Sequence, residues 1–169
     1  MSFSLPQDLI DRLEEQFGAA KARQAVMGMT SRYVTLRVNT LKSTDAAIME
    51  IFRQELIQFE RAKGLPHAFI VKNRKAKELL NHRMCLNGLV YLQGLTSMLP
   101  PIVLDPQPNE PIADFCAAPG SKTSQMAAMI GGTANISAFE PNFVRYQKLH
   151  NTLKIQGAEF VKTQQIDSI

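Results

Sequence analysis

Apolar and polar side chains along the first half of the chain follow helical and strand periods in turn. Residues 6–18 repeat apolar side chains at helical spacing and end at Gly18, a residue type that commonly terminates a helix. A second helix is expected over 19–29, and the alternation over 32–39 predicts a half-buried strand. The other elements expected here are a helix over 43–56 that begins at Ser43 or Thr44, and strands over 66–71 and 88–93. This order predicts a small mixed α+β domain.

The second half of the chain alternates strands and helices. The elements expected are strands over 112–116, 134–139 and 159–165, with helices over 123–130 and 142–156. Turn-forming residues fill 104–111 and mark a domain boundary. The β-α-β-α-β order is half of a doubly wound nucleotide-binding sheet. The predicted fold class is therefore α/β, with a small α+β domain in residues 1–105 and a partial Rossmann-like domain in residues 106–169.

Composition narrows the class of protein. With 169 residues of which 45% are hydrophobic, the chain can build a real core, which excludes global disorder. No window approaches the roughly 20 apolar residues that a membrane helix needs. Cys85 and Cys116 alone can form neither a disulfide framework nor the usual two-pair metal site. We expect a soluble cytoplasmic protein without a metal.

Positive charge is concentrated in the first 100 residues, although the net charge of the whole chain is only +4. The densest cluster is KNRKAK, which contributes Lys72, Arg74, Lys75 and Lys77. Because Lys and Arg supply most of the sequence-independent affinity for nucleic acid, this cluster is a candidate RNA-binding surface. A solvated helix face is the alternative interpretation.

The loop between the first strand and the first helix of the second half reads DFCAAPGSKT, residues 114–123. A Walker A loop would place glycines where this sequence has Cys116 and Ser121, so a triphosphate site is excluded. The G-x-G-x-x-G fingerprint of dinucleotide sites is absent as well, because the turn contains a single glycine.

The loop can nevertheless hold a different nucleotide-like ligand. Its small residues, which let a ligand approach the backbone, are Ala117, Ala118, Gly120 and Ser121. Pro119 suits the start of a helix, whose free N–H groups can meet a carboxylate. Glu140 follows Gly120 at the spacing where such folds place an acid against ribose hydroxyls. A ligand with a ribose and an anionic end fits these features.

DFCAAPGSKT resembles motif I of the Sun/Fmu-type RNA cytosine-5 methyltransferases, usually written D-x-C-A-A-P-G-G-K-T. The resemblance continues in RVNT at 37–40, in GLVYLQGLTSMLPPIVLDPQPNE at 88–110, and in single residues of 140–157, so it covers the whole chain. Ser121 replaces the second glycine of the motif, which is similar to a branch of the family that modifies small-subunit ribosomal RNA.

The resemblance implies that the second half is the start of a methyltransferase sheet and that S-adenosylmethionine is the methyl donor. Glu140 would accept hydrogen bonds from the ribose, Arg145 would support Glu140, and Asp167 would lie near the adenine amino group. The full implied cofactor-binding set is Cys116, Ala117, Ala118, Pro119, Gly120, Ser121, Lys122, Glu140, Arg145 and Asp167.

Methylation of cytosine at C5 requires a thiolate that first adds to C6 of the ring. In the resembled family the two working cysteines follow the fourth and fifth strands, in Pro-Cys and Thr-Cys motifs that this sequence does not contain. Cys116 is interpreted as a small packing residue, and Cys85 has no acid or base pattern around it.

We therefore expect no catalytic residue in this chain. The favoured hypothesis is an N-terminal fragment of an RNA (cytosine-5) methyltransferase, inactive alone, whose partners are RNA and a C-terminal catalytic half. Ribosomal RNA is expected rather than tRNA. The alternative is a naturally short, non-catalytic protein of the same family that binds the cofactor or RNA.

Overall fold

The structure is a computed structural model that describes residues 5–30, 33–132 and 135–166. The chain divides into two compact units, residues 1–33 and 34–169. None of the helices in the described ranges is long and apolar enough to cross a membrane. The domain boundary expected at residue 105 lies inside the second unit and stays a prediction.

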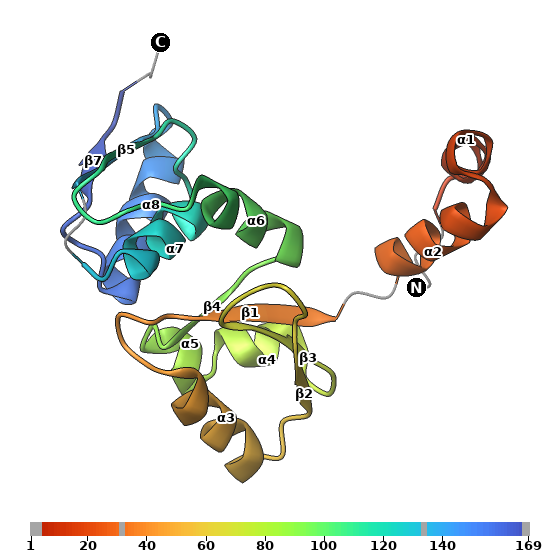
Figure 1. Ribbon diagram of the computed structural model, residues 1–169, viewed down its shortest axis with the longest axis horizontal. Coiled ribbons are helices and arrows are strands. Elements are labelled where there is room, and N and C mark those ends of the chain that lie inside the picture. The colour runs from red at the N-terminus through yellow and green to blue at the C-terminus, as the bar shows by residue number, and fades with distance from the viewer. Residues whose placement is uncertain (1–4, 31–32, 133–134, 167–169) are drawn as a thin grey trace. The chain divides into compact units, whose positions relative to one another are not determined.

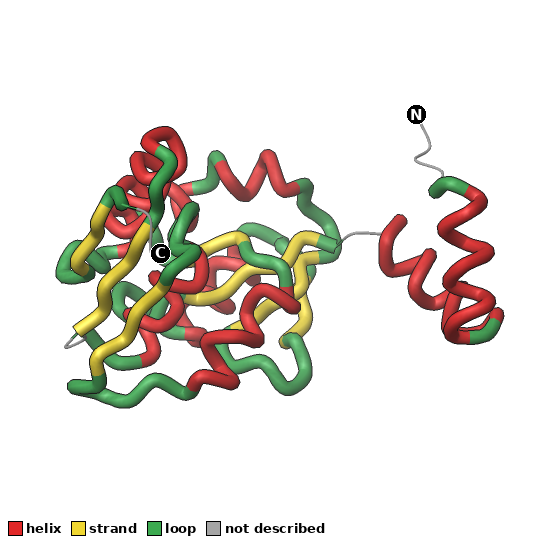
Figure 2. Tube along the Cα trace, turned by 90° about the horizontal axis from the view of Figure 1, so that it is seen from above, coloured by secondary structure: helices red, strands yellow, loops and turns green. Residues whose placement is uncertain are grey.

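The first unit consists of two helices, α1 (Gln7–Phe17) and α2 (Ala19–Thr30), which pack against each other (Figure 2). Gly18 joins them with a positive φ of 77°, and its N–H donates to the carbonyl of Glu14 at 2.9 Å. Both helices and the glycine between them were expected from the sequence. No side chain of α1 is buried.

The second unit begins with a four-stranded antiparallel sheet in the order β2-β3-β1-β4. Its strands are β1 (Val34–Val38), β2 (Phe59–Arg61), β3 (Ala68–Val71) and β4 (Val90–Leu92). The helices of this part are α3 (Asp45–Gln54), α4 (Ala76–Leu80) and α5 (Arg83–Leu86). Thr44 caps α3 by accepting a hydrogen bond from the N–H of Ala47 at 3.2 Å.

The core of this sheet forms around aromatic side chains. Phe52 of α3 lies 5.8 Å from Phe69 of β3, ring centre to ring centre, and Leu36 of β1 is fully buried beside them. The expectation of a half-buried β1 is wrong, because Arg37 on its other face is only 3% exposed. Strand β1 is covered on both sides, which periodicity alone does not reveal.

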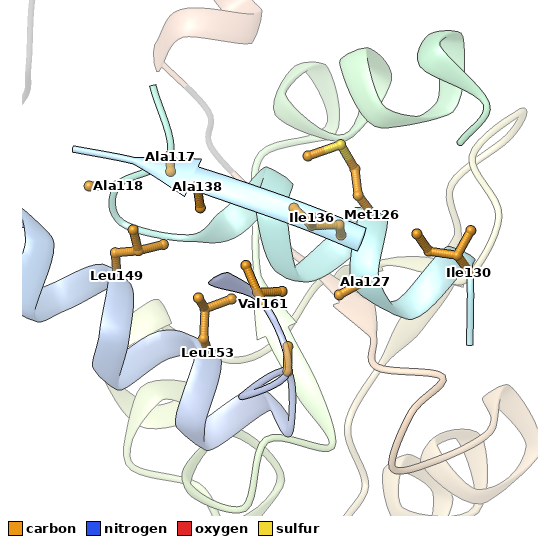
Figure 3. Packing of buried hydrophobic residues seen from close by; sticks show 11 residues of the cluster. Ala117, Ala118, Met126, Ala127, Ile130, Ile136, Ala138, Leu149, Leu153 and Val161 are labelled. Carbon is orange, nitrogen blue, oxygen red and sulfur yellow. The ribbon is translucent and has the colours of Figure 1, made fainter. Parts of the chain in front are cut away.

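A second, parallel sheet follows in the order β5-β6-β7 (Figure 1). Its strands are β5 (Pro111–Asp114), β6 (Asn135–Phe139) and β7 (Lys162–Gln164), and the helices are α6 (Leu95–Leu104), α7 (Ser121–Met129) and α8 (Phe143–Gln156). Figure 3 shows Leu149 and Leu153 of α8 pointing toward β6, where Ile136 and Ala138 complete the core. The predicted β-α-β-α-β unit is confirmed.

Helix α6, which contains Pro100 and Pro101, was not predicted from the sequence. A proline inside a helix removes one N–H donor, so the carbonyl four residues earlier loses its helical partner. The structure supplies a substitute at Ser97, whose carbonyl accepts a hydrogen bond from the Gln93 side chain at 3.1 Å. This substitute is local, whereas α7 adds a tertiary contact through the Gln125 side chain, which donates to the carbonyl of Met98 in α6 at 2.9 Å. The other elements that the sequence did not predict are β2, α4 and α5.

Residues 37–42, RVNTLK, join the two sheets, and we call them the clamp segment. The Asn39 side chain, which is fully buried, donates to the carbonyls of Gly88 and Gln156, both at 2.8 Å. Thr40 donates to the last turn of α7, at the carbonyl of Ala128, 3.0 Å away.

Lys42 completes the clamp by donating to the carbonyl of Ile155 at 2.6 Å. The clamp segment thus binds the C-terminal ends of α7 and α8. Those ends expose carbonyls that have no partner within the helix.

The close approach at Gly88 gives a test of this junction. A Cβ at Gly88 would lie 2.0 Å from the carbonyl oxygen of Ile155, and the residue has a φ of 69°. We expect Gly88→Ala to lower the free energy of unfolding by about 3 kcal/mol or more, because the cost of a positive φ in alanine adds to the cost of the steric overlap with Ile155. Urea unfolding of the purified chain measures this loss.

Gly64 is the matched control, because its φ is 74° and nothing lies within 4 Å of the place that an added Cβ would take. Gly64→Ala should lower the free energy of unfolding only by the cost of a positive φ in alanine, about 1 kcal/mol. Equal losses of unfolding free energy in the two variants would show that the close contact between Gly88 and Ile155 does not contribute to stability.

Candidate functional site

The loop after β5 is held by Asp114, the last residue of that strand. One carboxylate oxygen accepts from the N–H of Cys116 at 3.2 Å, and the other accepts from the hydroxyl of Thr123 at 2.6 Å. The loop is also closed by a hydrogen bond from Gly120 N–H to the Ala117 carbonyl at 2.7 Å. Asp114 therefore ties the strand, the loop and the first turn of α7 together.

From the sequence alone, Asp114 and Thr123 were identified as positions of the motif, and no role was predicted for either side chain. The available signal was an acid at a strand end followed by a hydroxyl residue in the first turn of the next helix. That pattern indicates a side-chain brace across a tight loop.

Helix α7 begins at Ser121 with Gly120 as its N-cap, and no side chain caps it. Gly120 has a φ of 103°, and a methyl group there would lie 3.1 Å from the side chain of Thr152 on α8. The position thus requires glycine for its backbone conformation and for packing. Because no side chain makes a capping hydrogen bond at the start of α7, its first N–H groups can receive an anionic group of a ligand.

Pro119 was expected at the helix start, but it lies before the N-cap. Gly120 takes the N-cap position because the chain must turn there with a positive φ, which proline cannot adopt.

Glu140 follows β6 and is 2% exposed. Its carboxylate accepts from the N–H of Asn142 at 3.1 Å and pairs with the Arg145 guanidinium at 3.2 Å. Arg145 also donates to the carbonyl of Ala118 at 3.3 Å. The structure therefore brings the loop, Glu140 and Arg145 together, whereas Asp167 lies outside the described residues.

A cavity of about 360 Å³ opens beside the loop, between α6, β5 and α7. Cys116 and Lys122 both line it, and Cys116 is exposed. The interpretation of Cys116 as a packing residue is therefore wrong, because the loop turns its side chain out of the core. Phe115 next to it stacks on Phe139, with ring centres 5.4 Å apart.

Cys85 lies in α5 and packs against the hydrophobic core of the antiparallel sheet. Burial raises the pKa of the Cys85 thiol to about 11. Because the thiolate is the reactive form, this cysteine is a poor nucleophile near neutral pH. Within the described ranges, no three His, Cys, Asp or Glu residues gather as a metal site would require.

The basic cluster lies in the segment from the end of β3 to α4. Lys72 pairs with Glu60 at 2.8 Å, and Arg74 donates to the carbonyl of Glu55 at 3.0 Å. Lys75 and Lys77 are exposed. Two of the four candidate RNA-binding residues therefore contact the protein itself.

These features define the class of protein: an α/β protein with half of a doubly wound sheet, a small-residue loop before a free helix N-terminus, and a buried acid after the second strand. A family model described as 16S rRNA methyltransferase RsmB/F matches residues 101–168.

Relatives extend the similarity to the rest of the chain. The 25S rRNA (cytosine-C(5))-methyltransferase NSUN5 of Arabidopsis thaliana is 35% identical over 132 residues, 78% of this chain and 22% of that protein. Ribosomal RNA small subunit methyltransferase F of Shewanella loihica is 36% identical over 129 residues, 73% of this chain and 26% of that protein. The tRNA (cytosine(49)-C(5))-methyltransferase of Pyrococcus abyssi is 39% identical over 99 residues, 55% of this chain and 30% of that protein.

A solved structure described as a methyltransferase homolog protein from Pyrococcus horikoshii matches with a TM-score of 0.84 and 29% identity, over 98% of this chain and 54% of that one. The chain belongs to the Sun/Fmu family. It spans roughly a quarter of the length of the relatives it matches.

The brace between Asp114 and Thr123 can be tested without a ligand. Thr123→Val keeps the shape of this fully buried side chain but removes the hydroxyl donor. We expect a loss of about 1–3 kcal/mol in the free energy of unfolding and faster amide exchange at Cys116, because the carboxylate loses a close partner. Urea unfolding and hydrogen exchange measure the two effects.

Ser121→Ala is the control for that variant, because Ser121 takes part in the turn through its carbonyl, which accepts from the Ser124 hydroxyl at 3.2 Å. If Ser121→Ala accelerates exchange at Cys116 as strongly as Thr123→Val does, the Asp114 brace is not what orders the loop.

Proposed function

We propose that this chain carries the cofactor-binding part and the N-terminal region of an S-adenosylmethionine-dependent RNA (cytosine-C5) methyltransferase. The observation that carries the proposal is the meeting of three groups: the braced loop of residues 116–120, the uncapped start of α7, and the Glu140–Arg145 pair. Membership of the Sun/Fmu family and the names of its relatives support the reaction class.

The residues present fit such a cofactor, which supplies a methyl group on a sulfonium sulfur when bound. Its carboxylate would meet the N–H groups at the start of α7, where Gly120 leaves the backbone open. Its ribose would lie against Glu140, one oxygen of which accepts a hydrogen bond while the other pairs with Arg145, and both can accept more. Arg145 is 57% exposed along its side chain, so it can move toward solvent at little cost when a ribose takes its place.

The nucleophile of the reaction is proposed to lie outside these 169 residues. Cys85 is half-buried with a raised pKa, and Cys116 belongs to the loop that is assigned to the cofactor. We propose that the thiolate comes from a C-terminal part of the protein, which would act as a partner of this chain. A non-catalytic protein that binds the cofactor or RNA is the second candidate.

Ribosomal RNA is the proposed substrate rather than tRNA. The description of the matching family model names 16S rRNA, and two of the relatives named above act on ribosomal RNA by their names while one acts on tRNA.

Incubating the chain with labelled S-adenosylmethionine and ribosomal RNA tests whether the nucleophile lies outside these residues. No transfer is expected without a C-terminal half that carries cysteines, and turnover by the chain alone would place the nucleophile within it.

Cofactor binding gives a separate test of the site. We expect S-adenosylmethionine to bind the chain weakly, because a half sheet lacks part of the walls of the pocket. Titration should shift the NMR signals of the amides of Ser121, Lys122 and Thr123, and Glu140→Gln should weaken binding about tenfold as one charged acceptor is lost.

Glu159→Gln is the matched control, since Glu159 is an exposed acid away from the loop. Its titration should match that of the unchanged chain. Absence of any shift at millimolar ligand, or equal weakening by both variants, would contradict the assigned cofactor site.

RNA binding by the basic cluster is tested by charge reversal. Lys75→Glu with Lys77→Glu should weaken RNA binding and reduce its salt dependence, with the slope of log K against log salt falling by roughly one to two units. The same change at Lys148 and Lys154, exposed on α8, is the control and should leave the slope unchanged. Equal slopes for both pairs would favour the solvated-face interpretation of Lys72 to Lys77.

A further inference from the structure

Arg37 of β1 is a buried cation. Its Nε donates to the side chain of Gln93 at 3.2 Å, and one terminal nitrogen donates to the hydroxyl of Ser124 at 3.1 Å. The other terminal nitrogen, Nη1, is buried and has no hydrogen-bond partner in the part of the chain that the structure describes. The guanidinium carbon also lies 5.8 Å from the ring centre of Tyr91.

No carboxylate pairs with this guanidinium among the residues that the structure describes. Burial lowers the pKa of Arg37 to about 10, so the side chain remains charged at neutral pH. A buried charge without a counter-charge is costly. An anion placed near the guanidinium would offset part of that cost.

The contacts of Arg37 lead to the start of α7. The Ser124 hydroxyl that receives the Arg37 hydrogen bond donates in turn to the carbonyl of Ser121 at 3.2 Å, the first residue of the helix. Gln93, the other partner of Arg37, donates to the side chain of Gln125 at 2.8 Å. The guanidinium is therefore connected to two successive residues of the first turns of α7.

The charge of Arg37 and the dipole of α7 both favour an anion at the N-terminus of this helix. The N-terminus of α7 carries the positive end of the helix dipole and has no side-chain cap. A neighbouring buried cation raises the positive potential there, and the Asp114 carboxylate, which accepts from the Thr123 hydroxyl at 2.6 Å, offsets part of it. A ligand with a negative group at this helix end would be stabilised by both.

We propose that Arg37 is a positioning residue for the anionic end of the cofactor. It fixes the first turn of α7 through Ser124, and its charge favours a carboxylate at that helix end. The inference rests on the proposed function, because it concerns one end of the cofactor named there. It also assigns a positioning role to the antiparallel sheet, which reaches the first turns of α7 through Arg37 of β1.

The test compares two ligands that share the adenosine part. S-adenosylmethionine carries the carboxylate, whereas 5′-deoxy-5′-methylthioadenosine lacks the whole amino-acid end. Arg37→Gln and Ser124→Ala should each weaken binding of the first about tenfold and change binding of the second by less than about twofold. Titration followed by NMR gives both affinities on the whole chain.

Thr40→Val is the control, because Thr40 holds the opposite end of α7 through the carbonyl of Ala128 at 3.0 Å. This variant should lose stability without changing the ratio of the two affinities. Equal weakening of both ligands by Arg37→Gln and Ser124→Ala would reduce Arg37 to a packing role and overturn the inference. If Arg37→Gln does not fold, Ser124→Ala decides the outcome, since it keeps the arginine.

Spectra without ligand separate this inference from the proposed function. Ser124→Ala should shift the amide signals of Ser121 to Thr123, whereas Thr40→Val should not. If the unchanged chain binds neither ligand, the proposed function fails, and these ligand-free shifts alone decide whether Arg37 positions the turn. Absence of a difference between Ser124→Ala and Thr40→Val would then overturn the inference.

Discussion

The hydrogen bonds that the clamp segment makes to helix ends are the constraint on which the rest of the second unit depends. The last carbonyls of a helix have no partner within it, and burying them unpaired costs free energy. Asn39 and Lys42 satisfy the end of α8, and Thr40 satisfies the end of α7. One short stretch after β1 thereby joins an antiparallel sheet to a parallel one.

This constraint reaches the candidate site because α7 is held at both ends. Thr40 binds its last turn, and Arg37 reaches its first turns through Ser124. Helix α8 is fixed by the same segment and packs directly on Gly120, so the turn before α7 is enclosed from two sides. The loop geometry therefore depends on residues far earlier in the chain as well as on its own small side chains.

Much of the geometry of the candidate site was predicted from the sequence, because its signals are local. Small residues in the loop, a glycine before a helix and an acid after the second strand are short-range requirements of a ligand-binding turn. The structure brings the loop, Glu140 and Arg145 into contact as expected. It corrects the placement of Cys116, since exposure depends on how the loop turns and not on the polarity of the residue.

The sequence by itself determined the periodic elements: both helices around Gly18, β1, and the alternating strands and helices after residue 110. The hydrophobic pattern of each element follows from which of its faces is buried, and residues close together in the sequence are enough to reveal that pattern. Only the tertiary structure decided that α6 forms across two prolines and that Arg37 is buried. Both have partners distant in sequence, Gln125 for the helix and Ser124 for the arginine, and periodicity carries no information about such partners.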